Sequence, residues 1–232
     1  YFGGLSSVDH FLAVSHFQRK KLLSMGLESS KVDVLYNFAD IKQQPSHHDG
    51  NHFLFVGRLE NGKGLETLLN SYALYLEKCC QKGLPLHIVG AGTEKLALKG
   101  LAAKLGLGEN VKWLGYLNGP ELAEQYQECR ALINPSEFNE TFGLTNLEAM
   151  THGRPVLCSN SGAFPEVVRD GLDGHVLPCK TPEAFAERMY KLTADKARQL
   201  GMNGFTRASD EFSAQVHVKE LEKVYLNLIG EK

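Results

Sequence analysis

Residues 53–76 read FLFVGRLENGKGLETLLNSYALYL, and this stretch decides the fold class of the chain. A short apolar run at 53–56 predicts a buried strand, and a glycine-rich loop at 57–64 follows it. Apolar residues then recur at the spacing of one helical face. They are Leu65, Leu68, Leu69, Tyr72, Ala73 and Leu76. The stretch therefore predicts a strand, a loop and an amphipathic helix in that order.

The same alternation of apolar strands and helices continues along the chain. Predicted strands lie at 53–56, 86–89, 111–114, 131–134, 155–158 and 174–177. Helical stretches then follow at 181–193, 195–208 and 212–229, the last with an apolar set that begins at Phe212. Strand–helix alternation implies parallel strands with helices on both faces of the sheet. We predict an α/β fold with a Rossmann-like parallel sheet, which binds ligands at the carboxyl ends of its strands.

A shorter segment of the same kind precedes this array. Residues 11–14 predict a strand, Ser15 is placed to cap a helix that runs to about Met25, and 32–35 predict a second strand. A polar stretch rich in turn-forming residues, 43–51, predicts a linker. The first residues include no initiator Met and no basic leader, so we interpret the N-terminus as a cut within a longer protein.

The composition is that of an ordinary soluble globular protein. Hydrophobic residues make up 43% and charged ones 22% of the chain, and the net charge of −2 gives no overall attraction to nucleic acid. No apolar run approaches the roughly 18 residues that span a bilayer. The five cysteines show no C-x-x-C spacing and predict reduced cytosolic thiols, and the nine histidines show no metal-ligand spacing. The basic stretch 16–21 is interpreted as a solvated helix face.

The loop at 57–64 carries two cations at the predicted start of a helix. From Gly57 to Lys63 it meets the G-x-x-x-x-G-K part of a P-loop, but Gly64 stands where Ser or Thr would hold Mg²⁺. No predicted strand ends in the Asp that a P-loop enzyme also needs, which disfavours a P-loop NTPase. Arg58 and Lys63 beside helix N–H groups suit an anion, and a solvated turn with surface charges is the alternative.

A second glycine-bearing turn follows the strand at 86–89. Gly90 and Gly92 open a dinucleotide-binding pattern, but Lys95 occupies the place of its third glycine. The pattern therefore argues against NAD as a cofactor. The two glycines are consistent either with close backbone approach to a ligand or with an ordinary strand-to-helix turn.

The most informative stretch, 134–150, places a carboxylate on each side of a predicted helix start. Glu140 lies in the loop, and Glu148 lies on the helix that begins near Gly143. The N–H groups of residues 142–144 are the unpaired donors of such an end, and they attract a phosphate or a sugar hydroxyl. The alternative is structural, with Glu140 as a helix-start charge and Glu148 at the surface. Apolar neighbours of Glu148 argue against a surface position.

The spacing from Glu140 to Glu148, within PSEFNETFGLTNLEAMTHGRPV at 135–156, resembles the E-x7-E segment of glycosyltransferase family 4. Further segments resemble the same family in order and spacing, from about residue 9 to about residue 195. They are FVGRLENGKG at 55–64, IVGAG at 88–92, VKWLGYL at 111–117 and SGAFPEVVRDGLDG at 161–174. Thr141 stands where many members have Pro, and its hydroxyl is expected either to cap the helix or to contact the ligand.

The resemblance implies the C-terminal half of a GT-B fold, the half that holds a nucleotide sugar. Arg58 and Lys63 would bind the diphosphate and stabilise it as a leaving group, with no metal ion or other cofactor. Glu140 would contact the transferred sugar, Glu148 the ribose hydroxyls and the loop at 116–117 the base. The remaining expected binding residues are Gly57, Gly90, Gly92, Tyr116, Leu117, Thr141, Phe142, Gly143 and Leu144.

The activity implied by the resemblance is retaining transfer of a sugar from a UDP- or GDP-sugar. The acceptor is unknown and is expected to be a sugar, a lipid-linked sugar or another molecule, and nucleic acid is not an expected partner. The implied location is the cytoplasm, with peripheral membrane contact through the N-terminal domain. Two alternatives remain open: a nucleotide-sugar-binding module without turnover, and a GT-B nucleotide-sugar 2-epimerase.

The resemblance also divides the chain. Residues 1–37 would be the end of an N-terminal domain, 38–51 a linker, 52–208 the nucleotide-sugar domain and 209–232 a helix that crosses back toward the N-terminal domain. The rest of the N-terminal domain, which supplies the acceptor site in this family, would be missing. We therefore expect the isolated chain to bind nucleotide weakly at best and to transfer no sugar.

Overall fold

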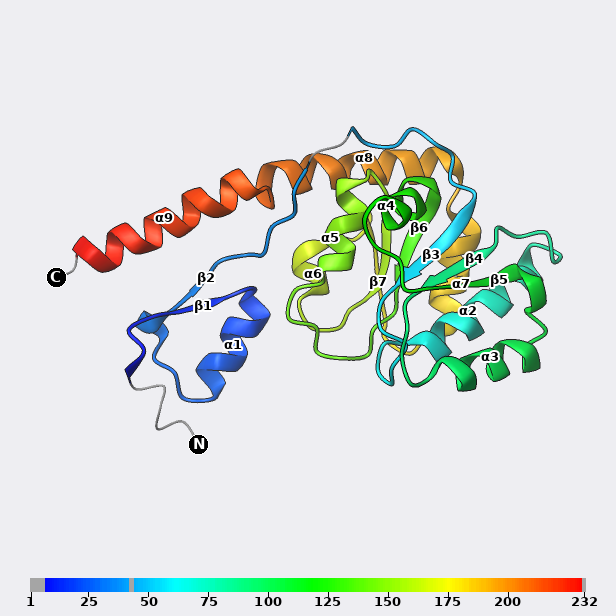
Figure 1. Cartoon of the computed structure of the whole chain (residues 1–232), viewed down its shortest axis with the longest axis horizontal. Helices are drawn as coiled ribbons and strands as arrows, with labels where there is room; N and C mark the ends of the chain where they lie inside the picture. Colours follow the sequence, from blue (N-terminus) through cyan, green and yellow to red (C-terminus); the bar gives the residue numbers. More distant parts are fainter. Residues whose placement is uncertain (1–6, 42–43, 231–232) are drawn as a thin grey trace.

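The structure, a computed structural model, describes residues 7–41 and 44–230. It has an α/β body, a small N-terminal unit at residues 11–34 and a final helix, α9 (Ala214–Gly230), which extends away from the body (Figure 1). The N-terminal unit lies at the end of the molecule toward which α9 extends (Figure 1). The expected chain start, linker and final helix include residues 1–6, 42–43 and 231–232, which lie outside the described residues.

The body is built on one six-stranded sheet in which every strand pair is parallel. The strands are β3 (His52–Val56), β4 (Leu86–Val89), β5 (Val111–Gly115), β6 (Cys129–Asn134), β7 (Val156–Ser159) and β8 (Gly174–Leu177). Their order across the sheet is β5-β4-β3-β6-β7-β8. The chain thus moves from β3 to one edge, returns to β6 beside β3, and continues to the other edge. This is the strand order of a Rossmann fold, and the predicted fold class is confirmed.

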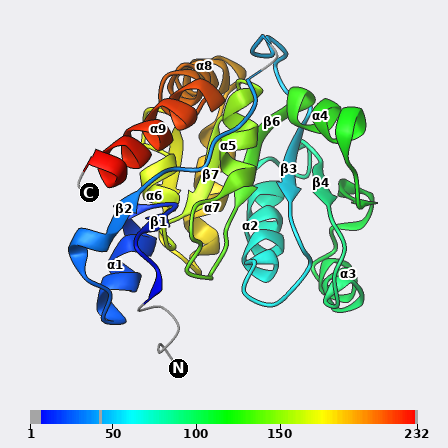
Figure 2. The ribbon, with the colours of Figure 1, turned by 60° about the vertical axis from the view of Figure 1, so that its left-hand side comes forward.

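Helices cover both faces of this sheet, as predicted (Figure 2). Side chains of β3 alternate between the faces, since Phe53 and Phe55 belong to one buried cluster and Leu54 to the other. The first cluster includes side chains from α2 (Leu65–Lys78), α3 (Lys95–Lys104) and α7 (Pro182–Lys191). The second includes side chains from α4 (Gly119–Glu128), α5 (Leu144–Thr151), α6 (Phe164–Val167) and α8 (Ala194–Glu211).

The predicted apolar stripe of α2 faces the sheet. At most 3% of the surface is exposed for Leu65, Leu68, Leu69, Tyr72 and Leu76. The helix begins after Gly64, whose φ of 72° is left-handed. A Cβ at Gly64 would lie 2.0 Å from the carbonyl oxygen of Pro135, in the loop after β6. Gly64 is therefore needed for the close approach of the loops that follow β3 and β6.

The N-terminal unit contains two short parallel strands and a helix. Its elements are β1 (Phe11–Ala13), α1 (His16–Ser24), the 3₁₀ helix η2 (Ser29–Lys31) and β2 (Val32–Val34). The hydroxyl of Ser15 accepts a hydrogen bond from the N–H of Gln18 at 3.0 Å, so the predicted helix cap is confirmed. The element boundaries agree with the predicted ones to within one residue.

The boundary between the last two helices differs from the prediction. Helix α8 continues to Glu211 instead of ending at 208, and α9 begins at Ala214. Phe212, predicted to open the apolar face of the final helix, lies between the two helices and is only 1% exposed. Its ring packs on Tyr36 and Phe142, with centroids 5.5 and 5.8 Å away. The sequence prediction placed the junction a few residues too early and assigned Phe212 to the final helix, because Phe212 also fits the helical spacing.

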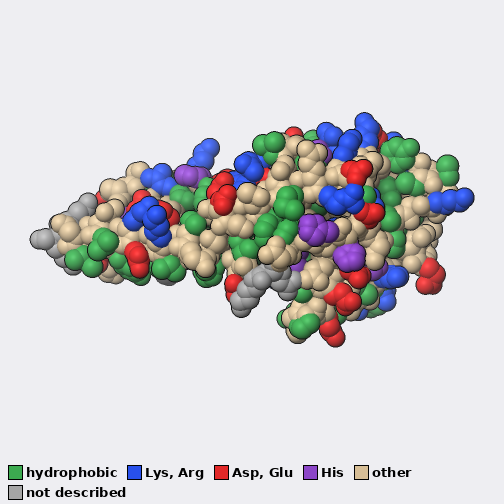
Figure 3. All heavy atoms as spheres, turned by 90° about the horizontal axis from the view of Figure 1, so that it is seen from above, with side chains coloured by type: hydrophobic (Ala, Val, Ile, Leu, Met, Phe, Trp, Pro, Cys, Tyr) green, Lys and Arg blue, Asp and Glu red, His purple; other side chains and the backbone are tan. Residues whose placement is uncertain are grey.

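Helix α9 has no buried residue within its described side chains. Tyr225, Leu226 and Ile229 are 57%, 68% and 72% exposed. Figure 3 shows one face of the narrow part of the molecule, where hydrophobic, basic and acidic side chains are interspersed. No helix in the described part of the chain combines the length and the apolar character that crossing a membrane requires.

The cysteines and potential metal ligands are dispersed. All five cysteines are free thiols, and burial raises the pKa of the Cys129 thiol to about 12. Within residues 7–41 and 44–230, no cluster of three or more His, Cys, Asp or Glu side chains is arranged to hold a metal ion.

Candidate functional site

The loops after β3 and β6 meet at the carboxyl ends of the two central strands. At this point the direction of the strand order reverses, and doubly wound sheets bind their ligands at such a switch point. The N–H groups of Glu137 and Phe138 donate to the carbonyl oxygen of Gly62 at 2.7 and 3.2 Å. These hydrogen bonds hold the two loops together, and residues of both loops line one hollow.

Most of the predicted site residues line this hollow, which we call the switch-point hollow. They are Gly57, Arg58, Lys63, Glu140, Thr141, Phe142, Gly143 and Leu144. Sequence reasoning did not assign the remaining lining residues to a site. They are Asn37, Phe55, Val56, Asn134, Thr145 and Phe164. Val56 and Asn134 end predicted strands, and this is the one signal that could have indicated them.

Lys63 and Glu140 form an ion pair across the hollow. The Lys63 Nζ lies 2.7 Å from Glu140 Oε1, and each side chain is 20% exposed. The buried hydroxyl of Ser136 donates to the same oxygen at 2.6 Å. The backbone of Glu140 is also held, because its carbonyl oxygen accepts from the N–H of Ala163 at 2.8 Å. The carboxylate therefore has a fixed position between a cation and a neutral donor.

Arg58, near the start of the same loop, is more exposed than Lys63. Its guanidinium pairs with the Glu60 carboxylate at 2.9 Å, and its side chain is 70% exposed. An ion pair this exposed contributes little to stability because water screens it. Exchange of Glu60 for a ligand anion would therefore cost little free energy.

The N-terminus of α5 forms the floor of the hollow beside Glu140. Gly143 is the N-cap residue, with a φ of 106° and no side-chain hydrogen bond to the helix. Thr141 therefore does not cap the helix, and its contact with a ligand stays a prediction. In the described part of the chain, the N–H groups of Phe142, Gly143 and Leu144 meet no hydrogen-bond acceptor. Such an end carries partial positive charge and suits an anion.

Glu148 lies about one helical turn after the start of α5 and does not line the hollow. It is half-buried, so the alternative of an ordinary surface position is wrong. Its Oε2 accepts a hydrogen bond from the hydroxyl of Tyr126 on α4 at 2.7 Å. Burial and the adjacent Glu148 carboxylate raise the pKa of Tyr126 well above its usual value. The phenol thus stays protonated and holds the carboxylate in place.

Gly90 and Gly92 bring the loop after β4 under the loop after β3. A Cβ at Gly90 would lie 1.8 Å from the carbonyl oxygen of Gly57, and one at Gly92 would lie 2.2 Å from that of Leu59. Packing of the two loops therefore requires these glycines whether or not a ligand binds. Neither glycine lines the hollow.

The residues expected to contact the base also lie outside the hollow. Tyr116 and Leu117 follow β5, the edge strand on the β4 side, and Tyr116 is 74% exposed. They share the carboxyl edge of the sheet with the hollow, since all its strands are parallel. The geometry thus places them along the same edge without bringing them into contact with Lys63 or Glu140.

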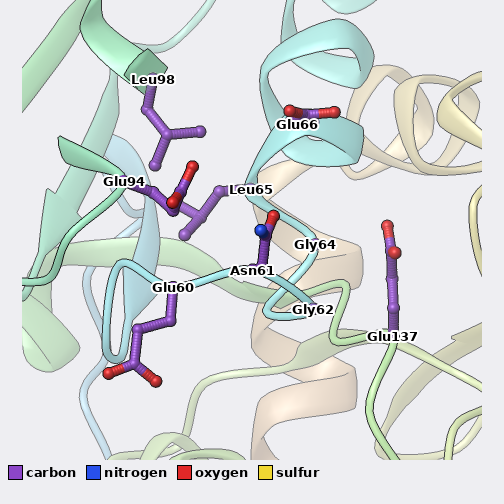
Figure 4. A pocket seen from close by; sticks show the side chains of 9 residues that line it. All are labelled: Glu60, Asn61, Gly62, Gly64, Leu65, Glu66, Glu94, Leu98 and Glu137. Atoms are coloured by element: carbon purple, nitrogen blue, oxygen red, sulfur yellow. The ribbon is translucent and has the colours of Figure 1, made fainter. Parts of the chain in front are cut away.

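A second hollow lies on the other side of the loop after β3 and has a different character. The carboxylates of Glu60, Glu66, Glu94 and Glu137 surround it (Figure 4). The hollow contains none of the predicted cations among its lining residues. Glu60 and Glu137 pair with Arg58 and Lys180, but carboxylates and no cation line this hollow, which disfavours a phosphate. Lys63, Arg58 and the α5 N-terminus attract one. An anionic ligand therefore fits the switch-point hollow better.

The strand order and the switch-point hollow define a Rossmann-like α/β domain with an anion-suited site between its central strands. The family model of Glycosyl transferases group 1 matches residues 37–207, and the chain belongs to this family.

The curated relatives include glycosyltransferases from bacteria. The chain is 32% identical over 180 residues to D-inositol 3-phosphate glycosyltransferase of Corynebacterium jeikeium (strain K411), a match that covers 75% of this chain and 43% of that protein. It is 30% identical over 215 residues to O-antigen chain mannosyltransferase C of Escherichia coli, a match that covers 91% of this chain and 55% of that protein. The chain thus spans about half the length of these relatives.

Solved structures with the same fold include complexes with nucleotides. A TarM variant from S. aureus, in complex with fondaparinux, alpha-GlcNAc-glycerol and UDP, has a TM-score of 0.84 at 20% identity, covering 96% of this chain and 44% of that one. Anabaena HepE in complex with UDP-glucose has a TM-score of 0.82 at 22% identity, and the match covers 94% of this chain and 64% of that one. The fold of this chain is therefore that of the C-terminal half of GT-B glycosyltransferases.

Proposed function

We propose that this chain forms the sugar-donor half of a retaining glycosyltransferase that uses a UDP- or GDP-sugar. The observation that carries the proposal is the Lys63–Glu140 pair beside the open N-terminus of α5. A cation, a carboxylate and free N–H groups in one hollow suit a sugar diphosphate, which presents anionic oxygens and hydroxyls together. Family membership, and UDP or UDP-glucose in structurally similar chains, support the same class of ligand.

In the proposed reaction, the bond between the anomeric carbon and the diphosphate breaks, and negative charge grows on the departing diphosphate. Lys63, Arg58 and the N–H groups of α5 would stabilise that charge in place. Arg58 can turn from Glu60 toward the ligand because its side chain is largely exposed. Glu140, held by a buried hydroxyl, would accept hydrogen bonds from hydroxyls of the transferred sugar.

The nucleoside would extend from the hollow along the carboxyl edge of the sheet. Glu148 is proposed to bind the ribose hydroxyls with its free oxygen Oε1, since Tyr126 occupies Oε2. The base is proposed to lie toward Tyr116 and Leu117. The loop packing that Gly90 and Gly92 permit would form the surface beneath it.

Two other functions would use the same hollow. A nucleotide-sugar-binding module would bind the sugar donor without turnover. A GT-B nucleotide-sugar 2-epimerase would convert the sugar donor with water alone, so product formed without an acceptor distinguishes it from a transferase. Both alternatives are tested with the full-length protein, because the chain spans about half the length of its relatives.

Calorimetric titration of this chain with UDP, UDP-glucose and a GDP-sugar tests the binding claim. Lys63→Met should weaken binding at least about tenfold, or about 1.4 kcal/mol, because it removes a cation and leaves the Glu140 charge facing the phosphates. Lys99→Met changes an exposed lysine of α3 and should leave the affinity unchanged. Equal affinity of the parent and Lys63→Met for every nucleotide tested would exclude the proposed site.

A further inference from the structure

Glu166, on the short helix α6, lies against the N-terminus of α1 in the N-terminal unit. Its Oε2 accepts from the N–H of His16 at 2.7 Å, and its Oε1 accepts from the N–H of Phe17 at 2.6 Å. Figure 2 shows α1 beside α6. These contacts, which we call the Glu166 cap, join the N-terminal unit to the body through one carboxylate.

The Glu166 cap is favourable because the first N–H groups of a helix lack partners within the helix. Ser15 satisfies only the N–H of Gln18, so the two N–H groups before it depend on Glu166. A carboxylate at this end also interacts favourably with the helix dipole. The N-terminal unit thus supplies one part of its own helix cap, and the body supplies the other.

Tyr36 connects the same carboxylate to the segment that crosses between the two parts. Its hydroxyl donates to Glu166 Oε2 at 3.2 Å, and burial together with Glu166 raises the pKa of Tyr36 to about 12. Its ring packs on Phe142, with centroids 5.9 Å apart. Phe142 belongs to the loop of the switch-point hollow.

Helix α6 is fixed between the Glu166 cap and the hollow. Its first residue, Phe164, lines the hollow, and its ring would lie 2.7 Å from a Cβ at Gly143. At the other end, Arg207 of α8 donates to the carbonyl oxygens of Glu166 and Val167 at 2.9 and 3.0 Å. Helix α6 thus connects the lining of the hollow to the Glu166 carboxylate.

We propose that Glu166 is a positioning residue that orients the N-terminal unit on the body and whose cap is strengthened when a nucleotide occupies the switch-point hollow. The lining of the hollow comes from both sides of the junction, because Asn37 belongs to the crossing segment and Phe164 to the body. A ligand that contacts both sides favours their docked arrangement, and by linkage docking favours the ligand. The coupling to nucleotide rests on the proposed function.

Amide hydrogen exchange of the whole 232-residue chain, followed by NMR at His16 and Phe17, tests the Glu166 cap. Glu166→Gln and Glu166→Ala should raise these two exchange rates by about tenfold, while amides of β3 and β6 keep the parent rates. Glu109→Gln is the matched control, since this exposed carboxylate makes no ion pair within the described residues. Parent rates at His16 and Phe17 in both Glu166 variants would overturn the proposal.

The same measurement with saturating UDP separates positioning from simple capping. UDP should slow exchange at His16 and Phe17 in the parent by severalfold but not in Glu166→Ala, whose UDP affinity should fall by the same factor. Identical slowing by UDP in parent and variant would overturn the coupling. If calorimetry detects no UDP binding to the full-length parent protein, the proposed function is wrong, and the ligand-free rates of this chain still decide whether the cap exists.

A variant that fails to fold would be replaced by a milder one. Circular dichroism identifies such a variant, and Tyr36→Phe then removes only the hydroxyl that donates to Glu166. Exchange at His16 and Phe17 should rise severalfold in Tyr36→Phe. Parent rates in that variant would count against the proposal.

Discussion

Ser136 and Tyr126 each donate a hydrogen bond from a buried hydroxyl to one of the two site carboxylates. Ser136 bonds Glu140 at 2.6 Å, and Tyr126 bonds Glu148 at 2.7 Å. A carboxylate held this way loses rotamer freedom before the ligand arrives, so less entropy is lost on binding. In the proposed site, the two hydroxyls would contribute to affinity without touching the ligand.

Ser136→Ala should weaken nucleotide-sugar binding by about threefold to tenfold, since one hydrogen bond of about 1 kcal/mol to the Glu140 carboxylate is lost. Calorimetric titration of the chain measures the change. Ser209→Ala removes a hydroxyl that donates to the Phe205 carbonyl of α8, away from the hollow, and should keep the parent affinity. Parent affinity in Ser136→Ala would show that Glu140 does not need this support.

The sequence predicted both glutamates but neither hydroxyl. Glu140 and Glu148 belong to a spaced motif that resembles a known family, which made them recognisable. Tyr126 lies 22 residues from Glu148 on a different helix, and only the tertiary fold brings the two together. Contacts of this kind leave no local pattern, and the same holds for Glu166 and α1.

His52 makes folding sensitive to acid at a site outside the hollow. Its ring is fully buried and stacks on His87 with centroids 3.8 Å apart. Burial lowers the pKa of His52 from 6.5 to about 3, and the second cause is the neighbouring His87. The unfolded state then binds more protons than the folded state between these values, so stability falls as the pH drops below about 6.5.

His52→Phe should flatten this dependence, because Phe keeps a ring in the stack but cannot be protonated. In the parent, His52 should lower the free energy of unfolding by up to about 1.4 kcal/mol for each unit that the pH falls between about 6 and about 3. Urea unfolding at several pH values measures the slope. The exposed His47→Phe is the control and should keep the parent slope. The same slope in His52→Phe would contradict the assignment.

At the scale of elements, the start of α5 depends on glycine. Gly143→Ala should lower the free energy of unfolding by about 1–3 kcal/mol, because φ is 106° and the new Cβ would lie 2.7 Å from the Phe164 ring. Gly100→Ala, inside α3 with no neighbour within 4 Å, should instead raise it by about 0.5–1 kcal/mol. Urea unfolding of both variants tests the contrast, and equal effects would refute it.

Elements with strong periodicity were predictable, and those set by tertiary contacts were not. The apolar stripe of α2 and the alternation of strands and helices were enough to predict the Rossmann-like body, because the burial of these side chains follows from local spacing alone. The break between α8 and α9 was predicted at 209–211 but lies at 212–213, since Phe212 packs into the body against Tyr36 and Phe142.

At the scale of the molecule, the body is tightly packed, whereas α9 has little contact with it. Phe212→Ala should cost about 3–5 kcal/mol of stability, because it empties a buried aromatic site. Leu226→Ala in α9, where the side chain is 68% exposed, should change stability by less than about 0.5 kcal/mol. Thermal unfolding of this chain compares the two. A large loss in Leu226→Ala would show that α9 packs on the molecule.

The central claim is that the switch-point hollow holds a nucleotide diphosphate. A crystal structure of this chain with UDP-glucose tests it most directly. We expect the diphosphate oxygens within hydrogen-bond distance of Lys63 and of the N–H groups at the start of α5, with Arg58 turned from Glu60 toward the ligand. A nucleotide seated in the acidic hollow of Figure 4, or bound without contact to Lys63 and α5, would contradict the account.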